Sequence, residues 1–214
     1  MSLTRIKRNS FPLFSKHLPP ALTKGRRIGL LGGSFNPAHE GHLHISAAAK
    51  HWLKLDEIWW IVTPQNPHKG TTETESTDIR LAKARELTRT LPYIRISAIE
   101  RETGYNRTHD TLLLLLQAYP KTDFVWIGGY DLASGFHRWQ NWRGILDLVP
   151  VAFLARPPLK NLVRHAPVSL LSGAQGAQQV LSRPMQVELS PRHIYWVKSM
   201  PVCGQSSTAL RNRT

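Results

Sequence analysis

The hydrophobic positions of this chain alternate between short apolar runs and longer stretches with helical periodicity. Residues 28–31 form a continuous apolar run, which suits a parallel strand buried on both faces, and residues 40–55 repeat apolar side chains at near-helical spacing. The same alternation recurs along the chain and predicts an α/β fold with a mainly parallel sheet. The predicted strands are 27–32, 57–63, 94–99, 123–128, 149–155 and 193–198, and the predicted helices are 40–55, 77–91, 108–118, 131–135, 139–147 and a last turn from 207.

Local signals mark the limits of the second helix, whereas one later segment shows none. Asp78 lies where an acidic residue favours the start of the second helix, and Pro92 limits the end of that helix. Residues 157–183 carry Pro157-Pro158, two glycines and three glutamines and show no clear period. We expect loops there with room for one helix, and this segment is a candidate surface for a homo-oligomer.

Length and composition indicate one folded unit. A chain of 214 residues with 41% apolar content can bury one substantial core, so we expect a single domain over residues 25–214. Residues 1–39 contain no Asp or Glu, and residues 1–24 combine several Lys and Arg with three prolines. We expect 1–24 to be a basic, flexible arm. A transit peptide is an alternative, but a secretory signal is not, because no apolar stretch of about 7–15 residues follows the basic ones.

The formal net charge of +14 has three interpretations. It suits a nucleic-acid partner, because phosphate neutralisation drives most non-specific binding. It equally suits steering of anionic nucleotides into a cleft, or simply a solvated surface. The single cysteine, Cys203, rules out a disulfide framework and favours a cytoplasmic location. No apolar run approaches the roughly 20 residues that span a bilayer, so we expect no membrane partner.

Candidate chemistry gathers after the first predicted strand. Gly32 and Gly33 allow a sharp turn that brings backbone N–H groups close to a phosphate, and the helix that follows attracts negative charge at its N-terminus. His39 and His42 are three residues apart, so both face the same side of the first helical turn. Backbone, helix dipole and side chains together predict a polyphosphate site.

Three other interpretations of these residues stand beside that one. A Gly-Gly turn is common in strand-to-helix connections, and His39 and His42 can serve only to cap the helix. The two histidines also superficially resemble a metal pair. The zinc-protease motif needs histidines four apart inside a helix, however, and we find no third ligand cluster with suitable spacing. We therefore predict no protein-held metal.

The segment Gly-Gly-Ser-Phe-Asn-Pro-x-His-x-Gly-His at 32–42 resembles the signature of the nucleotidyltransferase superfamily with the His-x-Gly-His motif. Within it, the chain is most similar to bacterial nicotinate-nucleotide adenylyltransferases. The resemblance runs from about residue 27 to 211. The further matching segments are 63–69 (TPQNPHK), 107–112 (RTHDTL), 127–132 (IGGYDL) with 136–139 (FHRW), and 206–211 (SSTALR).

This resemblance implies a Rossmann-like, three-layer α/β/α fold and adenylyl transfer from ATP to nicotinic acid mononucleotide, which gives the dinucleotide and pyrophosphate. It implies Mg²⁺ bound mainly through ATP phosphates. The catalytic groups would be His39, His42 and Arg211. The implied ATP and phosphate contacts are Gly32, Gly33, Ser34, Phe35, Lys69, Ser206 and Thr208, and the implied mononucleotide contacts are Thr108, Asp131 and Trp139.

Several of these residues have plainer explanations. Trp139 can be a core tryptophan, Thr108 can simply cap its helix, and Lys69 can be a solvated loop residue. Arg107 departs from the family pattern, which commonly has an aromatic residue there, so that wall of the acceptor pocket is expected to differ.

Three rival functions share part of this pattern. A sister enzyme that uses phosphopantetheine or a phosphorylated alcohol would share residues 32–42, although segment 127–139 argues against it. Nicotinamide mononucleotide is an alternative acceptor that the sequence alone does not separate from the acid form, which the resemblance favours. A non-catalytic nucleotide sensor would keep the same scaffold. A basic nucleic-acid-binding protein would explain the charge, but the sequence shows no known recognition module.

Overall fold

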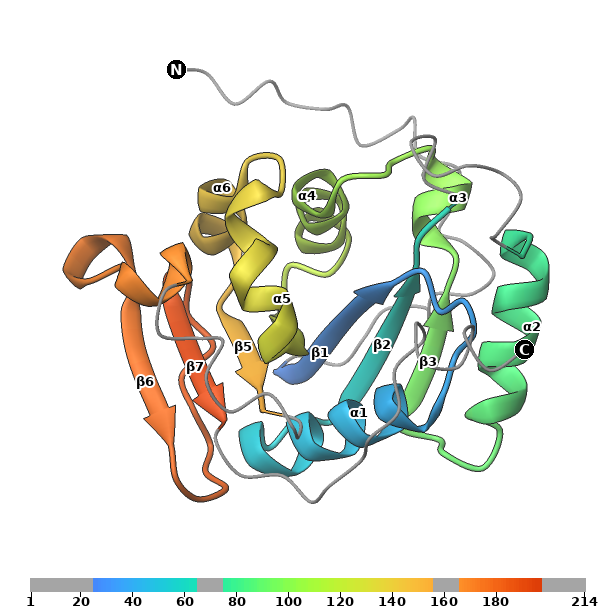
Figure 1. Ribbon diagram of the computed structural model, residues 1–214, viewed down its shortest axis with the longest axis horizontal. Helices are drawn as coiled ribbons and strands as arrows, with labels where there is room; N and C mark the ends of the chain where they lie inside the picture. The colour runs from blue at the N-terminus through green and yellow to red at the C-terminus, as the bar shows by residue number, and fades with distance from the viewer. Residues whose placement is uncertain (1–24, 65–74, 156–165, 198–214) are drawn as a thin grey trace.

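A seven-stranded sheet in which every pairing is parallel crosses the computed structural model, which describes residues 25–64, 75–155 and 166–197 (Figure 1). The strand order is β3-β2-β1-β4-β5-β7-β6. The strands are β1 (Arg26–Gly33), β2 (Glu57–Val62), β3 (Ile94–Ser97), β4 (Thr122–Gly129), β5 (Val151–Leu154), β6 (Ala177–Leu181) and β7 (His193–Val197).

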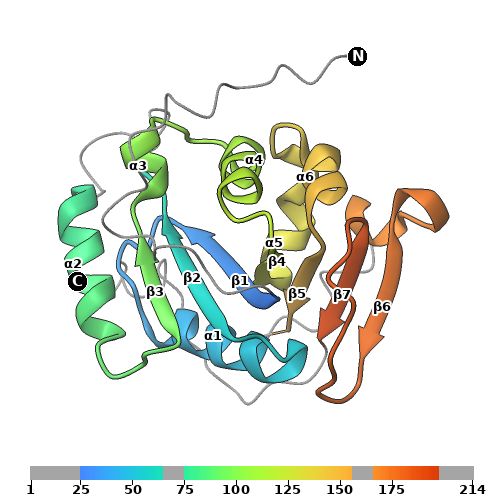
Figure 2. The ribbon, with the colours of Figure 1, turned by 180° about the vertical axis from the view of Figure 1, so that it is seen from behind.

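Helices cover both faces of this sheet (Figures 1 and 2). One face carries α1 (Glu40–Leu53) and α2 (Thr77–Leu87). The opposite face carries α3 (Ile99–Thr103), α4 (Thr108–Ala118), α5 (Tyr130–Gly135) and α6 (Trp142–Leu148). Short 3₁₀ turns follow at η1 (Phe136–Arg138), η2 (Pro167–Leu170) and η3 (Gly173–Gln175). The predicted three-layer α/β/α fold is confirmed.

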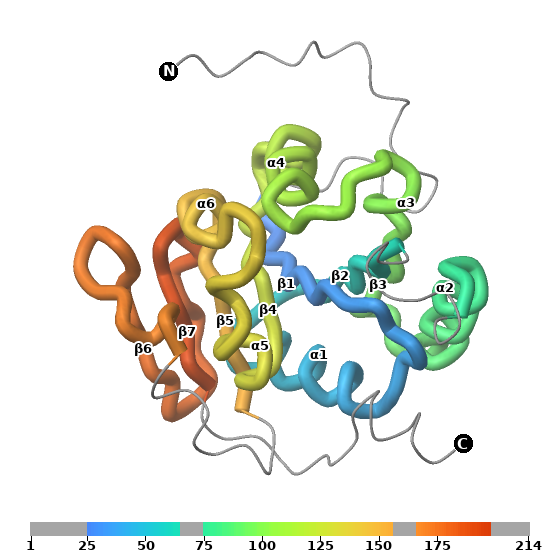
Figure 3. Tube along the Cα trace, turned by 45° about the horizontal axis from the view of Figure 1, so that its top comes forward, coloured from blue at the N-terminus to red at the C-terminus, as the bar shows by residue number. Residues whose placement is uncertain are grey.

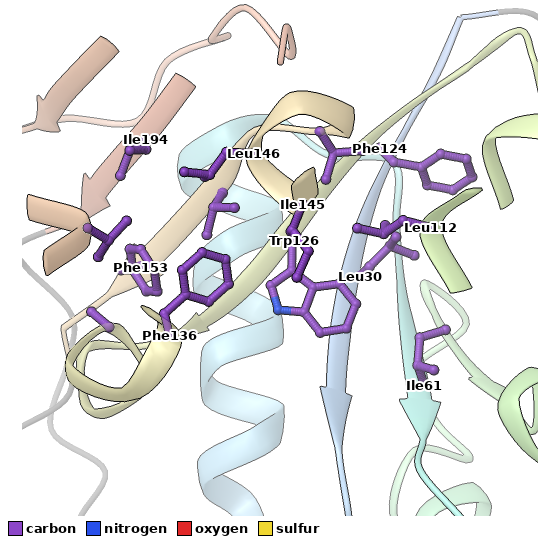
Figure 4. Close-up of a cluster of buried hydrophobic side chains, with 14 of the residues drawn as sticks. Leu30, Ile61, Leu112, Phe124, Trp126, Phe136, Ile145, Leu146, Phe153 and Ile194 are labelled. Carbon is purple, nitrogen blue, oxygen red and sulfur yellow. The ribbon is translucent and has the colours of Figure 1, made fainter. Parts of the chain in front are cut away.

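The alternation of side chains along each strand builds two separate cores. On β1, Leu30 packs in the layer beneath α4 and α6, whereas the next residue, Leu31, packs toward α1. On β4, Trp126 belongs to the first core, and Figure 4 shows its indole between Leu30 and Ile145. Because both faces are covered, the central strands are apolar throughout, which explains the continuous hydrophobic runs.

The strand order reverses direction between β1 and β4. These two strands are neighbours, with Leu31 opposite Ile127, but the chain leaves β1 toward α1 and leaves β4 toward α5, on opposite faces. Figure 3 shows the chain passing from β1 under the sheet into α1. In open α/β sheets the crevice outside the carboxyl ends at such a reversal is where ligands bind. The fold therefore places the candidate site after Gly33 and Gly129.

Several predicted boundaries were wrong, and one strand was missed. The strand predicted at 94–99 ends at Ser97, and residues from Ile99 form α3. The helix predicted at 77–91 ends at Leu87, four residues short, and the one predicted at 139–147 begins only at Trp142. Within 157–183, the described part holds the 3₁₀ turns η2 and η3 and the strand β6, which was not predicted. Four of the five β6 residues are exposed, so this edge strand lacks the apolar pattern that marks a buried one.

None of the helices in the described ranges has the length and apolar character needed to cross a membrane.

A buried carboxylate links the amino end of β2 to its two neighbouring strands. Glu57 accepts hydrogen bonds from Arg26 (2.6 Å), Arg95 (2.6 Å) and the indole of Trp59 (3.1 Å). Burial by itself raises the pKa of Glu57, but the bonds from Arg95 and Trp59 and the charges of Arg95 and Arg26 outweigh it, so the pKa lies below 4.5. The network therefore stabilises the fold above the ordinary glutamate pKa, and that stability is lost as the pH falls through the lowered value.

We expect Glu57→Gln to lower the free energy of unfolding by about 1–3 kcal/mol at pH 7, because it removes a charged acceptor from three donors. Urea denaturation at pH 7 and at pH 3 measures this. The difference between wild type and variant should shrink at pH 3. The control is Glu86→Gln, whose side chain is 76% exposed and pairs with a surface arginine, Arg89. An equal loss in both variants would contradict the role of the network.

Candidate active site

The carboxyl end of β1 requires a glycine at position 32. A Cβ atom on Gly32 would lie 2.5 Å from two carbons of the Trp126 ring, whereas a Cβ on Gly33 would meet Phe35 only at 3.5 Å. The backbone of Gly32 thus lies directly on the indole. Ser34 follows as an exposed residue, and Phe35 adopts a positive φ of 47° that completes the turn.

Both histidines cap the helix that follows. The N–H of Gly41 donates to Nδ1 of His39 (3.0 Å), and the N–H of His39 donates to Nδ1 of His42 (3.3 Å), which forms a capping box at the start of α1. A ring nitrogen that accepts a hydrogen bond carries no proton, so in each neutral imidazole the proton is on Nε2. Helix capping and phosphate donation are therefore compatible, because they use different nitrogens.

An aromatic cluster fixes the orientation of His42. Its ring lies 4.7 Å from that of Phe35 and 5.7 Å from that of Trp60, and Phe35 and Trp60 stack at 4.8 Å. His39 lies against His42 at 4.0 Å and is 5% exposed, whereas His42 is half-buried. Phe35 is only 1% exposed, so its ring belongs to the core and does not stack on a nucleotide.

The carboxyl end of β4 places the second set of predicted residues. Gly128 and Gly129 lead into α5, where Asp131 is exposed in the first turn. Trp139 ends η1 and is half-buried, edge-to-face with Trp126 at 5.8 Å. Trp126 therefore contacts both Gly32 and Trp139, and its ring connects the glycine turn with the predicted acceptor wall.

The start of α4 is not capped as predicted. The N-cap residue is Arg107, and no side-chain hydrogen bond closes the helix end, so the capping role considered for Thr108 was wrong. Thr108 is half-buried at the first helical position. Behind it, Thr111 donates to Oε1 of the buried Glu100 (3.1 Å) and holds this turn of α4 against α3.

Glu100 predicts a pH dependence of stability. It is 2% exposed, and burial raises its pKa to about 7, although the bond from Thr111 opposes the shift. The folded state therefore favours the protonated acid, and stability falls as the pH rises from the ordinary value of 4.5 through about 7.

Glu100→Gln is neutral at every pH. We expect its free energy of unfolding to rise relative to that of wild type by roughly 3 kcal/mol between pH 5 and pH 8. Urea denaturation at several pH values measures the gain. If both proteins show the same pH dependence, Glu100 does not titrate as described.

Sequence reasoning missed Arg80, a fully buried arginine on α2. Its guanidinium bonds to the carbonyls of Ser34 and Thr63, beside the glycine turn. The available signal was its position four residues before Ala84, on the apolar stripe of α2.

Several predicted residues lie outside the described ranges. These are Lys69, Ser206, Thr208, Arg211 and the basic arm 1–24. An open hollow lined by Lys50, Lys54 and Tyr93 lies at the far end of α1 from the histidines and is separate from the site. Within the described residues, no group of three or more His, Cys, Asp or Glu side chains is arranged to hold a metal ion.

Comparison with known proteins agrees with this geometry. A family model described as Cytidylyltransferase-like matches residues 30–213, so the chain belongs to that family of nucleotidyltransferases. A probable nicotinate-nucleotide adenylyltransferase from Caulobacter sp. (strain K31) is 40% identical over 187 residues, which is 87% of this chain and 97% of the relative. Another from Parvibaculum lavamentivorans is 44% identical over 148 residues, 69% of this chain and 73% of the relative. Within the family, the chain belongs with the nicotinate-nucleotide adenylyltransferases.

Solved structures show the same fold at low sequence identity. The Plasmodium falciparum nicotinic acid mononucleotide adenylyltransferase complexed with APC superposes with a TM-score of 0.62 and 14% identity, over 87% of this chain and 83% of that one. The same enzyme complexed with NaAD gives a TM-score of 0.56 and 18% identity, over 63% and 67%. These likenesses support the architecture alone.

Proposed function

We propose that the protein transfers the adenylyl group of ATP to nicotinic acid mononucleotide and releases pyrophosphate. The observation that carries the proposal is the capping box of His39 and His42 at the start of α1, directly after the glycine turn and the reversal of strand order. It engages Nδ1 of each ring, so Nε2 of each neutral imidazole carries the proton that a phosphate would need. The names of the relatives supply the reaction and the substrate, and the site supplies donors suited to a triphosphate.

The reaction depends on positioning the two substrates more than on transferring a proton. A phosphate monoester has its second pKa near about 6, so the attacking phosphate of the mononucleotide is already an anion at neutral pH. It would attack the α-phosphorus of ATP in line, with no general base and no covalent intermediate. His39 and His42 would donate from Nε2 to ATP phosphate oxygens as negative charge moves onto the pyrophosphate.

The other ATP contacts follow from the family motifs. Gly32 and Gly33 would allow close approach, and Ser34 and Phe35 would contribute hydroxyl and backbone N–H groups. Lys69 and the closing motif of Ser206, Thr208 and Arg211 would bind phosphate oxygens from the rest of the chain, with the guanidinium as a charged fork.

The acceptor would bind on the side of the site formed by the carboxyl end of β4 and the start of α4. Asp131, exposed at the start of α5, would accept hydroxyls of the ribose. Trp139, held edge-on by Trp126, would stack on the pyridine ring. The first-turn N–H groups at Thr108 have no side-chain cap, and they would receive the nicotinate carboxylate.

Magnesium would enter with ATP, bound through phosphate oxygens and water. The described part of the site offers Nε2–H donors, which suit phosphate oxygens and not a cation, so none of the steps above depends on a protein-held metal. The single cysteine supports a cytoplasmic location as part of the same proposal.

Pyrophosphate release tests the proposal directly. Purified full-length protein with ATP and Mg²⁺ is given nicotinic acid mononucleotide, nicotinamide mononucleotide or phosphopantetheine in parallel. We expect kcat/KM to be highest with nicotinic acid mononucleotide. A preference for another acceptor would keep adenylyl transfer and change the substrate, whereas no release with any acceptor would overturn the proposal.

A further inference from the structure

Arg80 is a buried cation that joins three segments of the chain. Its side chain is 0% exposed. Nη1 donates to the carbonyls of Ser34 and Thr63 (2.9 Å for Thr63), Nε donates to the carbonyl of Glu75 (3.0 Å), and Nη2 donates to Oγ1 of Thr77 (2.9 Å). The exit of β1, the exit of β2 and the start of α2 thus meet at one guanidinium.

The partners of Arg80 are unusual for a buried charge. Among the residues that the structure describes, no carboxylate lies within ion-pair distance of it, and all four acceptors are neutral oxygens. Burial lowers the pKa of Arg80, with the charge of Glu75 opposing it. Burying a charge without an ion-pair partner is costly, but an apolar residue of similar size would leave these four acceptors without the arginine's donors. The arginine therefore fixes the backbone of three chain segments at once, which no apolar side chain could do.

The bonds control which way the peptide groups of the glycine turn point. The carbonyl of Gly33 accepts from the N–H of Thr63 (3.0 Å), and the carbonyl of Ser34 accepts from Arg80. In a trans peptide the carbonyl and the following N–H point in opposite directions. Holding these two carbonyls toward β2 and α2 therefore turns the N–H groups of Ser34 and Phe35 away from Arg80.

We infer that Arg80 is a positioning residue for ATP, because it orients two backbone N–H groups of the glycine turn toward a phosphate. It fixes the Phe35 N–H directly, through the Ser34 carbonyl, and the Ser34 N–H indirectly, through Thr63, whose own N–H holds the Gly33 carbonyl. This inference rests on the proposed function, which places ATP at the glycine turn. Arg80 does not touch the nucleotide; it acts through the turn. Lysine cannot replace it, since an ammonium lacks the planar fork that reaches four acceptors at fixed angles.

The experiment titrates the non-hydrolysable analogue α,β-methylene-ATP into the full chain by calorimetry, with no acceptor present. We expect Arg80→Lys to raise the Kd of the analogue by at least about tenfold, because a small displacement of binding groups is costly. The KM for the acceptor should change by less than about twofold. Thr77→Val removes one of the four acceptors with little change of shape, and it should raise the Kd by about threefold.

Two controls separate positioning from general destabilisation. Leu81→Val alters the neighbouring buried residue of α2 without touching the turn, and Arg89→Lys changes a 71% exposed arginine just beyond the end of that helix. Both should leave the Kd unchanged at temperatures where they are folded. If folded Arg80→Lys and Thr77→Val bind the analogue like wild type, or if Leu81→Val weakens binding equally, the inference is overturned.

These outcomes differ from a failure of the proposed function. If wild type binds the analogue but releases no pyrophosphate with any acceptor, the reaction is wrong while the comparison of Kd values still tests Arg80. If wild type is active and the Arg80 variants bind normally, only the positioning role fails.

Discussion

Replacing His39 or His42 with alanine should lower kcat by roughly 10²–10³, the usual cost of removing a preorganised donor that stabilises developing charge. Each variant should also lose about 1 kcal/mol of stability, because both rings belong to the capping box of α1. Alanine removes the cap and the donor together, so it cannot assign the loss in rate to either one.

Asparagine at position 39 separates the two roles. Its side-chain oxygen can accept the Gly41 N–H in place of Nδ1, and Asn is among the best N-cap residues, but it has no group at the place of Nε2–H. We expect His39→Asn to melt close to wild type and to lose kcat as fully as His39→Ala.

The measurements are thermal unfolding and the rate of pyrophosphate release at saturating ATP. The control is His51→Ala, an exposed histidine in the last turn of the same helix. Wild-type turnover in His39→Asn would show that the histidine serves the helix alone, and the proposed catalytic role would be wrong.

The sequence predicted the strand, glycine turn and helix at residues 28–42 well because these elements are encoded locally. A buried strand, a glycine turn and a helix start occupy consecutive residues from Ile28 to His42, and the structure has them in that order. Parallel topology then brings the ends of β1 and β4 together without further information, so Asp131 follows the strand that neighbours β1.

Features that depend on tertiary contacts could not be predicted. The role of Arg80 depends on Ser34 and Thr63, which lie 46 and 17 residues away in the chain. The buried position of Phe35 depends on the ring of Trp60. Strand β6 is recognised only through its pairing with β7, because its own side chains are mostly exposed. In each case the residues that fix the position are distant in sequence, so the local pattern of apolar and polar residues does not predict the contact.

Gly32→Ala should damage both stability and activity, because the added methyl group meets a rigid buried ring. The added carbon would lie 2.5 Å from the ring of Trp126, which is 1% exposed and packed inside the core (Figure 4). Neither the ring nor the end of β1 can move without disturbing the other. We expect a loss of about 1–3 kcal/mol in the free energy of unfolding and a fall of roughly 10² in kcat/KM, since any shift of β1 displaces the turn that precedes both histidines.

Gly33→Ala is the matched stability control, because its Cβ would make only an ordinary 3.5 Å contact with Phe35. It should cost less than about 1 kcal/mol. A double-mutant cycle then identifies the cause: Trp126→Phe removes the ring atoms that the added methyl group would strike, so Gly32→Ala should cost clearly less in that background. Urea denaturation of the four proteins gives the coupling energy. An equal penalty in both backgrounds would mean that the indole is not what requires glycine at the end of β1.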